Sequence, residues 1–125
     1  MLPARHRLTH RGDIANVLRG AGAVRVGTRL MVIHAISVDT EADCPPRVGF
    51  AVSKAVGSAV VRNRVRRRLR AQMARRIFLL PWGVDVLVRA QPIAASATSL
   101  ELGHDLDAGI PRVVTRLSAS TGGGA

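Results

Sequence analysis

The most chemically informative segment of the sequence is a run of arginines near its middle, from residue 60 to residue 70. On a helix that turns about 100° per residue, apolar side chains four residues apart form one narrow seam, namely Val61, Val65, Leu69 and Met73. The arginines fall outside this seam, with Arg64, Arg68 and Arg75 on one flank, Arg66 and Arg70 on the other, and Arg67 outermost. A guanidinium group is a planar fork of donors that matches phosphate geometry and stacks on bases. The pattern therefore predicts a helix that packs by its seam and binds phosphates with its outer face.

The same stretch holds no carboxylate that would neutralise these arginines. No Asp or Glu occurs between Ala55 and Gly83, although like charges four residues apart on a helix repel one another. A polyanion supplies the missing negative charge, and release of its counterions favours binding. Two other interpretations are a solvated helix face, which normally mixes charge signs, and an amphipathic helix on an anionic membrane, which needs a wider apolar face. We favour binding to nucleic acid.

Overall charge and composition agree with a small folded protein that binds nucleic acid. The 125 residues carry 19 Lys and Arg against 8 Asp and Glu, a net charge of +11, and Lys54 is the only lysine. With 47% hydrophobic residues the chain is expected to form one domain, monomeric in the absence of RNA. No apolar run of about 18 residues occurs, so no membrane segment is predicted. The polar N-terminus and the single cysteine, Cys44, indicate a cytoplasmic location.

Catalysis by the protein itself would need nucleophiles, bases or metal ligands that converge in space. A zinc site needs three or four such ligands, whereas the four histidines are spread along the chain, at His6, His10, His34 and His104. Three carboxylates between residues 39 and 43 are typical of a solvated turn. We therefore assign no catalytic residue and no metal ligand to this chain.

Hydrophobic periodicity predicts the elements that position the arginine helix. Three strands are expected over 24–27, 29–38 and 47–52, and a fourth over 84–89. A first helix begins at a Thr9 cap and ends at Gly20, the arginine helix runs from a Ser58 cap to about Leu79, and a last helix from Ser96 or Thr98 ends near Leu117. The order α-β-β-β-α-β-α predicts a single-domain α+β sandwich over residues 1–118. Residues 1–8 are expected to be a flexible basic arm and residues 119–125 a disordered tail, and Gly109 and Pro111 disfavour a continuous last helix.

A strand-like stretch precedes the arginine run at a specific spacing. It reads Val48-Gly49-Phe50-Ala51-Val52-Ser53-Lys54 and is followed by Gly57, Ala59-Val60 and Arg62-Asn63-Arg64-Val65-Arg66-Arg67. Together these residues resemble the signature of bacterial ribonuclease P proteins. The resemblance is strongest over residues 48–70 and extends, in the order and length of elements, over residues 5–118.

This resemblance implies both a fold and a role. The family forms an α-β sandwich with an unusual left-handed β-α-β crossover through the arginine helix, although most such crossovers are right-handed. Its members assist a catalytic RNA that removes the 5′ leader from precursor tRNA. The implied partners are therefore the catalytic RNA subunit and precursor tRNA. The implied cofactor is Mg²⁺, bound mainly by the RNA and not by the protein alone.

The resemblance also implies two sets of site residues. The RNA-contacting set, to which we add the family-atypical Arg68, is Lys54, Arg62, Asn63, Arg64, Arg66, Arg67, Arg68 and Arg70. The cleft for the single-stranded leader, to which we add the one aromatic nearby, is Ile14, Leu18, Met31, Ile33 and Phe50. The family often has aromatic residues in this cleft, where stacking contributes about 1–3 kcal/mol per base. This chain has no tyrosine and only two phenylalanines, so weaker leader stacking is expected, and a core position for Phe50 is equally consistent with its sequence.

Three other functions compete with this one. A general RNA-binding module shares the charge argument but would not distinguish precursor from mature tRNA. A stand-alone protein nuclease needs a carboxylate or histidine cluster, which the sequence does not assemble. A DNA-binding protein would be expected to show a helix-turn-helix, and no short helix of that kind precedes the arginine helix.

Overall fold

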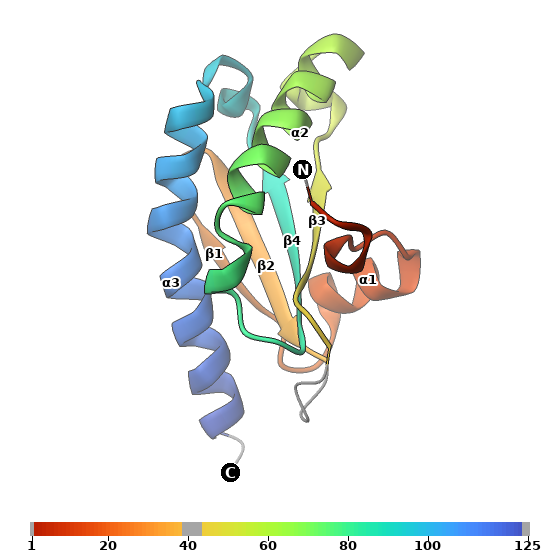
Figure 1. Cartoon of the computed structure of the whole chain (residues 1–125), viewed down its shortest axis with the longest axis vertical. Coiled ribbons are helices and arrows are strands. Elements are labelled where there is room, and N and C mark those ends of the chain that lie inside the picture. Colours follow the sequence, from red (N-terminus) through yellow and green to blue (C-terminus); the bar gives the residue numbers. More distant parts are fainter. Residues whose placement is uncertain (1, 39–43, 124–125) are drawn as a thin grey trace.

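The computed structural model describes residues 2–38 and 44–123 and has the predicted order of elements (Figure 1). The three helices are α1 (Arg11–Arg19), α2 (Ala59–Ala74) and α3 (Ser99–Gly123). The four strands are β1 (Val24–Gly27), β2 (Met31–Ser37), β3 (Arg47–Ala51) and β4 (Val84–Ala90). Four short 3-10 turns connect them, η1 (Ala4–His6), η2 (Lys54–Val56), η3 (Ile77–Leu79) and η4 (Pro92–Ser96).

The four strands form one mixed sheet in the order β1-β2-β4-β3. Neighbouring strands are antiparallel except for β3 and β4, which are parallel and joined through α2. In Figure 1, α2 descends in front of the sheet and β4 lies to the left of the rising β3, which makes this crossover left-handed. The handedness implied by the family resemblance is therefore present, against the usual right-handed preference.

Two helices cover one face of the sheet and the third covers the other (Figure 1). The larger core lies beneath α2 and α3, where three residues of the predicted α2 seam, Val65, Leu69 and Met73, are completely buried. The smaller core lies on the face that α1 covers and holds Val17 together with Leu8, Ile36 and Leu87. The seam thus packs as the four-residue spacing predicted, and it leaves the arginines of α2 around its outer side.

The N-terminal segment differs from the flexible basic arm that the sequence indicated. Leu2, His6 and Leu8 are buried, and Leu8 donates its backbone N–H to the carbonyl of Val48 at 3.0 Å. The His6 ring nitrogen Nδ1 lies 2.7 Å from the Pro46 carbonyl. These contacts cover the outer edge of β3, whose backbone groups would otherwise be unpaired. The segment therefore belongs to the folded domain.

The start of α1 also differs from the prediction by one residue. His10, and not Thr9, is the N-cap, because its Nδ1 accepts the backbone N–H of Gly12 at 3.2 Å. An N-cap needs an acceptor on its side chain for the free donors of the first turn. The Nδ1 of His10 meets that need as an acceptor, although the prediction had not considered histidine as a cap.

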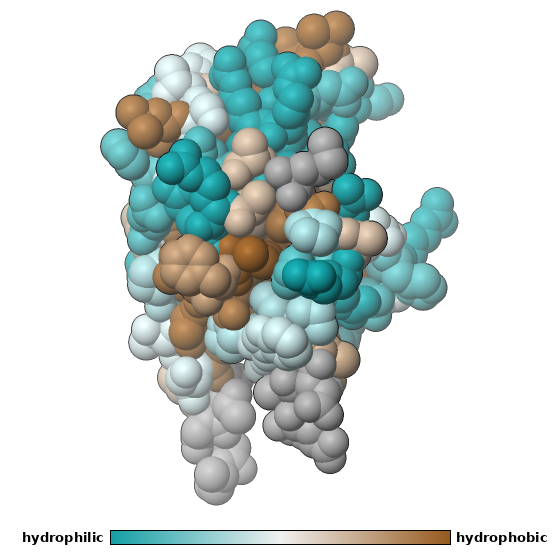
Figure 2. Space-filling model, viewed as in Figure 1, coloured by the Kyte–Doolittle hydropathy of each residue, from teal (hydrophilic) through white to brown (hydrophobic). Residues whose placement is uncertain are grey.

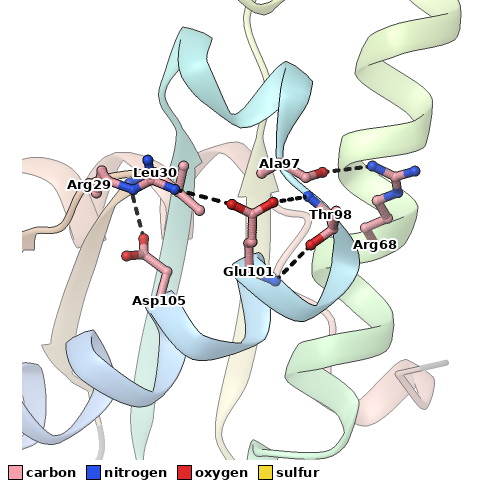
Figure 3. A network of polar contacts seen from close by, with 7 residues as sticks. All are labelled: Arg29, Leu30, Arg68, Ala97, Thr98, Glu101 and Asp105. Carbon is pink, nitrogen blue, oxygen red and sulfur yellow. Dashed lines mark hydrogen bonds and ion pairs between the residues drawn. The ribbon is translucent and has the colours of Figure 1, made fainter.

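The last helix is continuous through Gly109 and Pro111 and extends to Gly123, beyond the boundary predicted at residue 118. It begins with a capping box, in which Glu101 N–H donates to Thr98 Oγ1 at 3.1 Å and Thr98 N–H donates to Glu101 Oε1 at 3.0 Å (Figure 3). A Cβ added at Gly109 would lie 2.6 Å from Cδ1 of Ile33, so this glycine lets α3 approach β2 closely. The rest of the predicted tail, residues 124–125, lies outside the described residues.

Candidate nucleic-acid interface

The arginine helix is fixed at its start by a capped turn. Ser58 is the N-cap, as the sequence predicted, and its Oγ accepts the backbone N–H of Val61 at 3.3 Å. Gly57, just before it, has a φ of 154°, which side-chain-bearing residues rarely adopt. This turn brings the chain from the end of β3 over the sheet, so that α2 begins beside η2 and its exposed Lys54.

Three of the predicted RNA-contacting arginines are used within the protein. Arg62 Nε donates to the carbonyl of Gly57 at 3.2 Å. Arg64 Nη2 donates to the carbonyl of Ala95 at 3.2 Å. Arg68 Nη1 donates to the carbonyl of Ala97 at 2.7 Å, as Figure 3 shows. Arg64 and Arg68 therefore join α2 to η4 and to the residues just before α3, and they are less available to RNA than the sequence suggested.

Four of the five remaining members of the predicted set, all except Lys54, line an open groove of about 880 Å³ beside α2. Arg66 is oriented by Asn63, whose Oδ1 accepts from its Nη1 at 2.8 Å. Arg67 and Arg70 are exposed and make no hydrogen bond or ion pair with any residue that the structure describes. The groove also involves the N-terminal segment and β3, and its lining is Leu2, Arg7, Leu8, Thr9, Val48, Gly49, Phe50, Asn63, Arg66, Arg67, Arg70 and Ala71. Its arginine side can bind phosphates, and its other side is largely apolar.

The five predicted cleft residues do not lie together. Ile14 and Leu18 pack on the smaller core beneath α1, whereas Met31 and Ile33 are completely buried in the larger core on the opposite face. Phe50 is half-buried against the larger core and lines the arginine groove. Side chains alternate along a strand, so an error of one residue in phase moves a strand residue to the other face. Met31 and Ile33 are therefore core residues and cannot line an open cleft.

The residues of β2 that face α1 are Val32, His34 and Ile36, and His34 was not among the predicted cleft residues. Its side chain is buried, and its Nε2 has no hydrogen-bond partner among the described residues. Arg25 lies directly opposite it on β1, and Arg89 lies opposite Val32 on β4. The sequence signal that could have indicated His34 as a functional residue is a histidine inside a mostly apolar strand. This face combines the apolar residues of α1 with an unpaired ring nitrogen and two cations.

The pH dependence of stability should report the environment of His34. Burial, and then the positive charges of Arg89 and Arg25, lower the pKa of His34 below its ordinary value of 6.5. As the pH falls below about 6.5, the unfolded chain binds a proton that the folded chain resists, so the free energy of unfolding should decrease. Chemical denaturation between pH 7.5 and about 5 should show a smaller decrease for His34→Asn than for the wild type. Equal decreases in the two proteins would contradict this environment.

A carboxylate–arginine–carboxylate cluster fastens α1 to the sheet. Arg47 on β3 donates to both carboxylate oxygens of Asp85 on β4, at 2.9 and 2.8 Å. Its Nη1 also lies 3.3 Å from Oδ2 of Asp13 on α1. Asp85 is only 1% exposed, so its charge depends on this partner. The cluster sets the position of α1 over the face that holds His34.

Replacement of Arg47 by methionine should therefore destabilise the fold. The change keeps most of the side-chain volume but leaves the buried Asp85 carboxylate without its donor, which should lower the free energy of unfolding by about 1–3 kcal/mol. The matched variant Asp13→Asn removes only a half-exposed partner and should cost less than about 1 kcal/mol. Urea denaturation of both variants measures the difference, and equal losses would show that Asp85 does not depend on Arg47.

Among the described residues, no group of three or more His, Cys, Asp or Glu side chains is placed to hold a metal ion. The described helices also include none that is long and apolar enough to cross a membrane. The prominent chemical feature is instead a basic helix with free guanidinium groups above a groove, carried on an α-β sandwich. Fold and site together define a small basic protein of the nucleic-acid-binding class.

Comparison with known proteins identifies the family. The model of the ribonuclease P family matches residues 2–114. A ribonuclease P protein component of Streptomyces avermitilis is 47% identical over 120 residues, which cover 91% of this chain and 96% of the relative. One of Beutenbergia cavernae is 51% identical over 107 residues, 86% of this chain and 87% of the relative. The chain belongs to the ribonuclease P protein family.

Solved structures support the same fold. The ribonuclease P protein of Staphylococcus aureus superposes with a TM-score of 0.74 at 23% identity, over 90% of this chain and 97% of that one. The protein from Thermotoga maritima gives a TM-score of 0.69 at 19% identity, over 82% of this chain and 92% of that one. The α+β sandwich is thus kept at low sequence identity.

Proposed function

We propose that this chain is the protein subunit of a ribonuclease P and assists a catalytic RNA in removing the 5′ leader from precursor tRNA. The observation that carries the proposal is the pair of exposed arginines, Arg67 and Arg70, which have no partner among the described residues and line a groove without a carboxylate. Their guanidinium groups are available for RNA phosphates. The expected partners are the catalytic RNA subunit and precursor tRNA, and the expected compartment is the cytoplasm.

In this proposal the hydrolytic groups belong to the RNA, where bound Mg²⁺ would stabilise the attacking and leaving oxygens. The protein contributes affinity and orientation. Arg66, Arg67 and Arg70 reduce the repulsion between the two RNAs by neutralising phosphates near their contact. Arg64 and Arg68 act differently from the RNA contacts predicted for them, because their hydrogen bonds to Ala95 and Ala97 hold α2 in place.

We further propose that the leader lies on the face that α1 covers, along Ile14, Leu18, Val32 and His34. Ile14, Leu18 and Val32 are half-buried and provide apolar contact, and Arg25 and Arg89 are exposed beside His34 and can bind leader phosphates. The Nε2 of His34 is buried and has no hydrogen-bond partner among the described residues, so a leader donor or acceptor that reached it would satisfy it. Without the cleft aromatics, the leader is held more by phosphates than by stacking, so its affinity should depend steeply on salt.

The direct test measures substrate preference. A holoenzyme reconstituted with a bacterial ribonuclease P RNA should bind precursor tRNA more tightly than mature tRNA. The double variant with His34→Ala and Arg89→Ala should reduce that preference. The affinities of the catalytic RNA alone for the two tRNAs provide the baseline. Equal affinity for the two tRNAs, with and without the protein, would contradict the proposal and favour a general RNA-binding module.

A further inference from the structure

The aromatic residues of this chain are unusually placed. It has only three, and two of them, Phe78 and Trp82, are 77% and 57% exposed. Both lie on the loop that joins α2 to β4, together with Leu79, which is 43% exposed. Large apolar side chains that cluster on a surface normally mark a contact. The mechanism proposed above makes no use of this cluster.

The exposure of the two rings does not come from a loose loop. Leu80, between them, is 4% exposed and packs in the larger core. The 3-10 turn η3 is closed by Leu79 N–H to Arg76 O at 2.9 Å, and Gly83 N–H donates to Cys44 O at 2.6 Å. Gly83 also accepts from Val38 N–H at 2.8 Å. The loop is therefore anchored on both sides of Leu80, and ligand binding would cost little ordering of its backbone.

The aromatic loop continues the basic face of α2. In Figure 2 a hydrophobic area lies over the lower end of α2, on the same side of the molecule as the hydrophilic surface over the rest of the helix. Arg75, in the last turn before the loop, is exposed and has no hydrogen bond or ion pair within the described residues. Arg70, five residues earlier and on the other flank of the helix, is likewise free within the described part of the chain. A free cation of the last turn of α2 thus lies close in sequence to the two exposed rings.

We propose that Phe78 and Trp82 form a stacking platform for unpaired RNA bases, with Arg75 binding an adjoining phosphate. This inference rests on the proposed function and extends the RNA-contacting face beyond the end of α2. Aromatic rings beside guanidinium groups are the arrangement that binds single-stranded RNA without sequence preference. A second copy of the chain is a poorer occupant, because the net charge is +11 and no acid occurs between Ala55 and Gly83. The platform would offset the lack of aromatic residues in the leader cleft.

Trp82 is the only tryptophan, so its fluorescence reports on this loop alone. Titration of the full chain with an unstructured single-stranded oligoribonucleotide of mixed sequence should quench the emission in parallel with binding measured by anisotropy of labelled RNA. Phe78→Leu and Trp82→Leu keep an apolar side chain but remove the ring, and each should raise the Kd about fivefold. Leu100→Ala is the matched control, because Leu100 is 66% exposed at the start of α3, and it should leave the Kd unchanged.

The salt dependence separates stacking from charge. The leucine variants should keep the slope of log Kd against log salt, whereas Arg75→Ala should reduce it by about 0.7 for one lost phosphate. RNA binding without quenching, or with unchanged Kd in both leucine variants, would overturn the platform and leave the proposed function standing. Self-association that Trp82→Leu abolishes would instead assign the loop to a second copy. A chain that binds no RNA would overturn both proposals.

Discussion

Simultaneous replacement of Arg66, Arg67 and Arg70 by alanine is expected to weaken binding to the catalytic RNA by on the order of 100-fold. Each substitution removes about 1 kcal/mol or more of charge-assisted hydrogen bonding to phosphates. The same variant should lose most of its ability to support cleavage of precursor tRNA at low Mg²⁺. These three side chains line the groove, and none is buried in the core. The fold should therefore survive, which thermal unfolding can check. Electrophoretic mobility shifts or filter binding at several salt concentrations give the affinity and the number of phosphates lost.

The matched control removes the same charge from another part of the molecule. Arg29, Arg112 and Arg116 are exposed around α3 and β1, at the edge of the sheet away from β3. Their replacement by alanine lowers the net charge by the same amount and breaks only an exposed ion pair between Arg29 and Glu101 and exposed hydrogen bonds to backbone carbonyls, which contribute little. A triple variant of this kind should lose far less affinity. Equal losses in the two triple variants would mean that total charge, and not the groove, determines RNA binding.

Ile33→Ala should lower the free energy of unfolding by about 2–5 kcal/mol, the largest stability loss expected from a change near the predicted leader cleft. Ile33 is completely buried beneath α3, where its Cδ1 occupies the space that Gly109 leaves open. The adjacent Val32→Ala removes a half-buried side chain on the other face, and its loss should be clearly smaller, about 1 kcal/mol. Urea denaturation of both variants gives the comparison.

The order of the two variants should be reversed for substrate preference: the variant that loses more stability should lose less preference for precursor tRNA. Ile33→Ala, measured at a temperature where it is folded, should keep the preference of the holoenzyme for precursor over mature tRNA. Val32→Ala should reduce that preference, because Val32 lies beside His34 on the face that α1 covers. If Ile33→Ala alone changed the preference at full folding, the leader would have to contact the opposite face of the sheet, and not the face that α1 covers.

The arginine helix was predictable because its signals are local. One segment contains all of them: a four-residue apolar spacing, a serine cap and a glycine before the cap. Val65, Leu69 and Met73 pack as that spacing requires. The order of elements followed from the same kind of local pattern. The left-handed crossover did not, because it depends on how β3, α2 and β4 are arranged in space, and only the family resemblance implied it.

The phase of β2 was not predictable from its sequence. Helices cover both faces of this strand, so its residues are apolar on both sides and the polar alternation that usually marks an exposed face is absent. The role of Arg64 and Arg68 was hidden for a related reason. Their acceptors are the carbonyls of Ala95 and Ala97, far along the chain from α2, and no pattern of side chains reveals a backbone acceptor. Burial of Leu2 and the contact of Leu8 with β3 were equally non-local.

The most direct measurement is cleavage of a leader-bearing precursor tRNA by a bacterial ribonuclease P RNA at low Mg²⁺, with and without the full chain. We expect the protein to restore cleavage at the mature 5′ end, because its arginines replace part of the charge screening that high Mg²⁺ provides to the RNA alone. The triple variant of Arg66, Arg67 and Arg70 should fail to do so. Unchanged cleavage in the presence of the wild-type chain, while it binds unrelated RNAs equally well, would contradict its role as the ribonuclease P subunit.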